Sequence, residues 1–145
     1  MDAQIRLIRY PDWQQCLEGA IKYEVKKSVE WGKHDCCLVA FGLVRAITGV
    51  HLFPYRGQYS SYKELRAIGY NDFGFEKAMT MEDLSRRLLG DSIETDAARV
   101  GDMMCFEKGK RNSLGTLTAA GAMFRSFGGM IFAPPSRCKC AWKIG

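Results

Sequence analysis

The sequence predicts an α+β fold in which helices come first and a small antiparallel sheet follows. Up to residue 90, apolar side chains recur at helical spacing between residues that favour helix ends. From residue 97 on, short apolar runs are separated by Gly, Asn, Ser and Pro, which is typical of short strands. No linker, internal repeat or low-complexity segment interrupts the 145 residues, so we expect a single domain over residues 1–145.

The first two predicted helices differ in their pattern. Pro11 and Asp12 begin the first one, whose apolar residues from position 13 to 25 lie on one face and whose other face is charged. Asp35 is a good N-cap for the second, and residues 36–47 are apolar on most sides, as in a central helix. Gly49 is expected to end that helix.

Two shorter helices are expected before the sheet. A serine at position 60 or 61 caps the first, over residues 62–68, and Gly69 ends it. A Thr-x-x-Asp pattern at residue 80 begins the second, over residues 81–89, and Gly90 ends it.

Five short strands are expected in the second half of the chain. Their apolar runs cover residues 100–106, 114–118, 120–124, 130–133 and 140–144. Helices followed by strands in this way indicate segregated layers, which is the α+β arrangement.

The composition narrows the function classes. The formal net charge of +5 is scattered along the chain and accompanies no DNA-reading motif, so we expect no nucleic-acid partner. No run approaches the ~20 apolar residues of a membrane helix. Residues 1–4 begin no signal peptide, so we expect synthesis and folding in a cytoplasm, with no membrane partner.

The most informative segment is Glu-Trp-Gly-Lys-His-Asp-Cys-Cys at residues 30–37. It places Cys36 in the first turn of the predicted central helix. Unpaired backbone N–H groups and the positive end of the helix dipole lower the pKa of a thiol there and favour the nucleophilic thiolate. Asp35 would partly offset this effect; we interpret it as the helix cap rather than as a group that orients a base.

The six cysteines lie at positions 16, 36, 37, 105, 138 and 140. The first and fourth fall within apolar patterns and are expected in the core. Cys138 and Cys140 lie two residues apart on a strand and share a face, so with the pair at 36 and 37 they could form a zinc or iron–sulfur site. Neither pair has the two-residue spacer of a zinc knuckle, so no cofactor is our main expectation.

Three dipeptides carry a resemblance to a known superfamily. They are Trp-Gly at residues 31–32, Asp-Cys at 35–36 and Gly-Asp at 101–102. This order is similar to the NlpC-like cell-wall peptidases, papain-fold cysteine hydrolases that cut peptidoglycan stem peptides. The resemblance implies that Cys36 is the nucleophile, and that the strand after Gly-Asp is followed by one starting with the histidine base in a His-x-Gly-x pattern.

A closer resemblance covers nearly the whole chain. The sequence is similar to a small family of phage and prophage proteins within this superfamily, whose genes lie among those of tail assembly. The matching segments are residues 11–13, 31–37, 56–59 and 136–144. The resemblance implies a virion protein located in the tail, with other tail proteins as partners and peptidoglycan as a possible one.

The chain departs from the peptidase pattern at the base. Ser113 stands at the expected histidine position, in Ser-Leu-Gly-Thr at residues 113–116, and serine cannot activate a thiol as a base. His51 lies about 22 Å from Cys36 along the predicted helix. His34 lies in the loop two residues before Cys36, so it is the candidate base that remains, beside the alternative of a polar loop residue.

Three functions therefore stay open. The first is a tail-tip or tail-assembly protein with a degenerate peptidase fold, which the missing histidine favours. The second is an active peptidase or amidase that uses Cys36 with His34 or with a base from a neighbouring chain. The third is a metal-binding or iron–sulfur tail protein. The tyrosines at 55, 59 and 62 either line a groove beside Cys36 or belong to a packed loop.

Overall fold

The computed structural model describes residues 6–77, 79–109, 111–126 and 128–145. These residues form four α-helices and one five-stranded sheet, so the α+β class is confirmed. The helices are α1 (Trp13–Val25), α2 (Cys36–Thr48), α3 (Tyr62–Phe73) and α4 (Met81–Leu89). Residues 1–4, from which we expected no signal peptide, lie outside the described residues.

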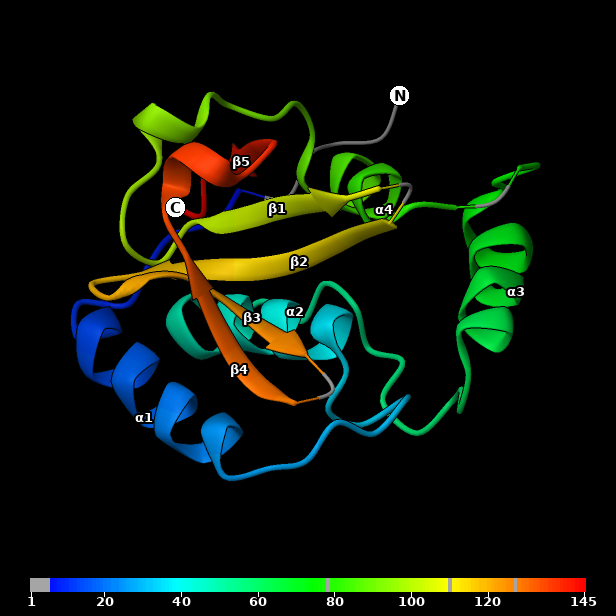
Figure 1. Ribbon diagram of the computed structural model, residues 1–145, viewed down its shortest axis with the longest axis horizontal. Helices are drawn as coiled ribbons and strands as arrows, with labels where there is room; N and C mark the ends of the chain where they lie inside the picture. Colours follow the sequence, from blue (N-terminus) through cyan, green and yellow to red (C-terminus); the bar gives the residue numbers. More distant parts are fainter. Residues whose placement is uncertain (1–5, 78, 110, 127) are drawn as a thin grey trace.

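The sheet is antiparallel throughout, with strand order β4-β3-β2-β1-β5. Its strands are β1 (Met103–Lys108), β2 (Arg111–Thr118), β3 (Gly121–Ser126), β4 (Gly129–Ala133) and β5 (Cys140–Trp142). Four consecutive strands form a meander, and β5 returns to pair with β1 at the opposite edge from β4 (Figure 1).

The main core lies between the sheet and α2. Helix α2 contacts β2 and β3, and α1 packs against α2 (Figure 1). The other face of the sheet carries a smaller apolar cluster, which includes Met104, Phe106, Leu117 and Phe124. None of the described helices is long and apolar enough to span a lipid bilayer.

Most predicted helix ends are confirmed, and one is wrong. Asp35 caps α2 and Gly49, at φ +76°, ends it, as expected. Helix α4 has the expected capping box. The predicted end of α3 at Gly69 is wrong, because α3 runs to Phe73 and Gly74 ends it. A Cβ on Gly69 would lie 2.7 Å from the Met79 sulfur, so this glycine serves close packing inside the helix.

The first strand begins later than expected. We predicted a strand from residue 100, but residues 100–102 precede β1, which begins at Met103. The buried Asp102 carboxylate explains the difference, because it accepts hydrogen bonds from the backbone N–H groups of Arg99 and Ile144. Arg9 forms an ion pair with the same carboxylate at 2.9 Å, so this turn ties both ends of the described chain together.

Candidate functional site

The start of α2 is organised around the buried carboxylate of Asp35. One oxygen accepts a hydrogen bond from the Leu38 N–H at 2.9 Å, which is the helix cap. The other accepts from the Gly32 N–H at 2.8 Å and from the Tyr59 hydroxyl at 2.6 Å. With three donors satisfied, Asp35 holds the loop, the helix start and the aromatic segment together, as a structural cap does.

Cys36 lies in the first turn of α2, as the sequence predicts, but its thiol is not activated. The pKa of Cys36 is raised to about 11, chiefly by burial and to a smaller extent by the neighbouring Asp35 charge, against a hydrogen bond with the Leu114 backbone that lowers it. Desolvation of the thiolate therefore outweighs the helix start, and the expectation of a lowered pKa is wrong. The thiol is therefore mainly protonated near neutral pH.

His34 is buried beside the thiol segment, with both ring nitrogens occupied. Its Nδ1 lies 3.1 Å from the Glu24 carboxylate and its Nε2 lies 3.4 Å from an Arg56 guanidinium nitrogen. A guanidinium can only donate, so Nε2 accepts and Nδ1 carries the proton toward Glu24. The lone pair that a base would use faces Arg56 rather than the Cys36 thiol. His51 follows the far end of α2 and is exposed.

The strand that reaches Cys36 is β2, through a hydrogen bond between the Leu114 backbone and the thiol. Ladder pairing sets Leu114 opposite Cys105, and both belong to the main core on the α2 side. Ser113 pairs with Phe106, which belongs to the cluster on the other face. Because side chains alternate along a strand, Ser113 lies on the face away from α2. A histidine facing Cys36 from β2 would therefore have to replace Leu114 or Asn112.

Sequence reasoning missed the charged residues around His34. Glu24 lies in the last turn of α1, and Arg56 lies in the Arg-Gly-Gln-Tyr segment that carried part of the family resemblance. Arg125 of β3 is buried and donates a hydrogen bond to the Glu24 backbone carbonyl, whereas its Nε has no partner among the described residues. No local spacing links these positions, because three separate elements bring them together.

The remaining candidate groups do not assemble into a site. Among the residues that the structure describes, no three His, Cys, Asp or Glu side chains lie close enough to hold a metal ion. Two of the three tyrosines belong to a packed loop, since Tyr59 bonds to Asp35 and Tyr55 contacts Phe53. Tyr62 instead begins α3, is exposed and contacts Trp31.

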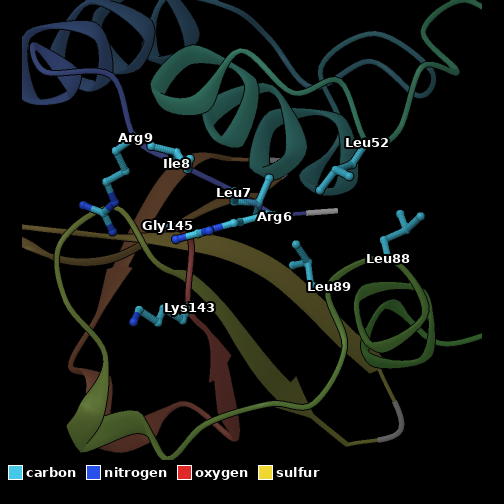
Figure 2. A pocket seen from close by; sticks show the side chains of 9 residues that line it. All are labelled: Arg6, Leu7, Ile8, Arg9, Leu52, Leu88, Leu89, Lys143 and Gly145. Atoms are coloured by element: carbon cyan, nitrogen blue, oxygen red, sulfur yellow. The ribbon is translucent and has the colours of Figure 1, made fainter. Parts of the chain in front are cut away.

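A pocket of about 560 Å³ lies away from the thiol, between the N-terminal segment, the end of α4 and the C-terminal segment. Figure 2 shows Leu52, Leu88 and Leu89 at one end, and Arg9 and Lys143 toward the other, with Arg6 between them. Arg9 is bound to Asp102, but Arg6 and Lys143 have no carboxylate partner in the described part of the chain. The pocket therefore joins an apolar end to uncompensated positive charge.

Comparisons with known proteins identify a family without a function. No curated protein and no solved structure gives a significant match to this chain. A family model described as a domain of unknown function, DUF6950, matches residues 8–144, and the chain therefore belongs to that family.

Proposed function

We propose that the protein is a non-catalytic component of a phage tail, located at the tail tip or needed for tail assembly, with a papain-like fold of the NlpC type. The observation that carries the proposal is the state of Cys36. Its thiol is protonated near neutral pH, and the ring nitrogens of the nearest histidine are engaged by Glu24 and Arg56. A thiol hydrolase needs a thiolate and a base within about 3 Å, and neither condition holds here.

The arrangement of elements supports the proposed ancestry. A cysteine begins the central helix, that helix packs against the sheet, and the second strand reaches the cysteine. These are the features that the resemblance to NlpC-like peptidases implies. Function resides in the site and not in the fold, so a chain with this fold and no base at Cys36 can serve binding without chemistry.

The test of the non-catalytic part is a digestion of purified peptidoglycan, read by mass spectrometry. Wild type and Cys36→Ser are compared, with an authentic NlpC-like peptidase as the positive control. We expect no new stem-peptide fragments from either protein. Fragments that appear with wild type and vanish with Cys36→Ser would overturn the proposal.

The pocket indicates how a tail partner could bind. We propose that it takes a segment of another tail protein that carries an acidic side chain beside apolar ones, because Arg6 and Lys143 supply unpaired positive charge next to three leucines. In a phage lacking the gene, wild-type protein is expected to restore infectivity, and the double variant Arg6→Glu/Lys143→Glu is not.

Lys22→Glu is the matched control, since it reverses an exposed charge on α1 and should still restore infectivity. Unchanged infectivity after deletion of the gene contradicts the tail function itself. Full restoration by the double variant contradicts only the role of the pocket.

One observation favours a second candidate function. The Leu114 backbone hydrogen bond to Cys36 lowers the pKa of this thiol, so β2 already supplies one of the stabilising contacts that a catalytic thiolate needs. A base from a neighbouring chain would then complete a peptidase. Alkylation of Cys36 by iodoacetamide, followed against pH, tests this idea: the midpoint stays near 11 in the isolated protein and must fall when the partner is added.

A further inference from the structure

Two buried cysteines face each other across the β1–β5 ladder. Cys105 of β1 is the direct partner of Cys140 of β5 in the antiparallel register. Both belong to the main core, so their side chains lie on the same face of the sheet. The structure records both as free thiols.

The spacing of such a pair suits a disulfide bond. Directly opposite residues in an antiparallel pair have Cα atoms about 4.5 to 5.5 Å apart. Disulfides form between residues whose Cα atoms are about 4.4 to 6.8 Å apart, so the backbone need not move far. Cys140 is among the neighbours that raise the pKa of Cys105, as expected for two thiols that lie near each other in the ladder.

The third cysteine of this region is placed differently. Cys138 belongs to the smaller cluster on the other face of the sheet, and its thiol donates toward the Pro134 carbonyl oxygen at 3.9 Å. It precedes β5 and has no strand partner in the β1–β5 register. The Cys-x-Cys spacing alone would favour a disulfide bond between Cys138 and Cys140, whereas the strand ladder favours one between Cys105 and Cys140.

We propose that Cys105 and Cys140 are a modification site that forms an intramolecular disulfide bond on exposure to a disulfide oxidant such as glutathione disulfide. Cys140 keeps 9% of its surface exposed on the short edge strand, while Cys105 keeps none, so Cys140 reacts first. Its thiolate attacks one glutathione sulfur, forms a mixed disulfide and releases one glutathione. The Cys105 thiolate then attacks the Cys140 sulfur and releases the second glutathione.

The reaction balances as an exchange. The two protein thiols lose two electrons and two protons, and glutathione disulfide gains them as two glutathione thiols. Burial raises the pKa of both thiols, so the exchange should be slow near neutral pH and faster at mildly alkaline pH. The bond would fix β5, which has three residues and lies at the edge of the sheet, to its neighbour β1.

The test uses the full chain, reduced and then incubated with glutathione disulfide at pH 8.5. The expected result is the loss of two of the six thiols, with a mass decrease of about 2 Da and no retained glutathione. Trypsin separates the three cysteines, because lysine or arginine precedes each of the relevant peptides. Without reduction, peptide 100–108 should be linked to peptide 140–143, and peptide 138–139 should stay free.

Two variants make the assignment decisive. Cys138→Ser should still lose about 2 Da on oxidation, and Cys140→Ser should not. The oxidised wild type should also unfold at a temperature higher by about 5 to 15 °C than the reduced form, while Cys140→Ser shows no such difference. A link between peptides 138–139 and 140–143, or only mixed disulfides with glutathione, overturns the proposal.

Discussion

Replacement of Asp35 by alanine tests the interpretation of this carboxylate as the structural centre of the thiol segment. The substitution removes the cap of α2, which costs about 1 kcal/mol in free energy of unfolding. It also leaves the Gly32 N–H and the Tyr59 hydroxyl without their buried acceptor, at about 1 to 3 kcal/mol each. We therefore expect a total loss of about 3 to 7 kcal/mol.

The assay is urea unfolding at pH 7, followed by tryptophan fluorescence, with the slope against urea compared between variants. Ser61→Ala is the matched control, because Ser61 caps α3 through the same type of bond at an exposed site and should cost only about 1 kcal/mol. If Asp35→Ala does not fold, Tyr59→Phe removes a single donor and should cost about 1.5 to 3 kcal/mol. Equal losses for Asp35→Ala and Ser61→Ala would refute the reasoning, since they would reduce Asp35 to an ordinary cap.

Three further predictions concern other parts of the molecule. The folded state raises the pKa of Cys36 from 9.0 to about 11, so its contribution to stability is fully present below pH 9 and is lost as the pH rises through 11. This loss amounts to about 3 kcal/mol in free energy of unfolding. Measured by urea unfolding between pH 9 and 11, the free energy of unfolding of Cys36→Ala should therefore fall by that much less than that of the wild type. An equal fall in both proteins would contradict the burial argument. Replacement of Arg9 by methionine leaves the buried Asp102 carboxylate without its partner and should cost about 3 to 5 kcal/mol in free energy of unfolding, whereas an effect below about 1 kcal/mol would mean that the pair behaves as an exposed one. Gly32→Ala places a Cβ 1.7 Å from a backbone carbonyl oxygen at φ +83°. Its thermal unfolding midpoint should therefore fall much further than that of Gly57→Ala, where φ is +80° and the space is open. Similar midpoints for the two variants would show that the loop around Gly32 rearranges at little cost.

The local elements of the fold followed from the sequence because their causes are local. A side chain that caps a helix bonds to N–H groups two or three residues away, so Asp35 and Thr80 predicted two helix starts correctly. Glycine in the left-handed region ended α2 for the same reason. At Gly69 this reasoning failed, because the absence of a side chain there serves contact with Met79, which lies ten positions further along the chain.

The candidate site depended on distances that no sequence spacing encodes. The pKa of Cys36 is set by how completely the sheet buries the helix start, and desolvation outweighs the local helix field. The orientation of the His34 ring depends on Glu24 and Arg56, which come from two other segments. The sequence shows that these residues are present, but it does not show that they lie next to one another.

Strand register was the feature that only the tertiary structure decided. The alternation of side chains along β2 and a pairing set by its neighbours place Ser113 on the face away from Cys36. The same kind of pairing brings Cys105 opposite Cys140 across 35 positions of the chain, while the adjacent Cys138 falls on the other face. By itself the sequence determined the helices, their caps and the order of layers, because neighbours along the chain fix them. The partners of each buried polar group and thiol were left to long-range packing, since a shift of one residue in register exchanges the two faces of a strand.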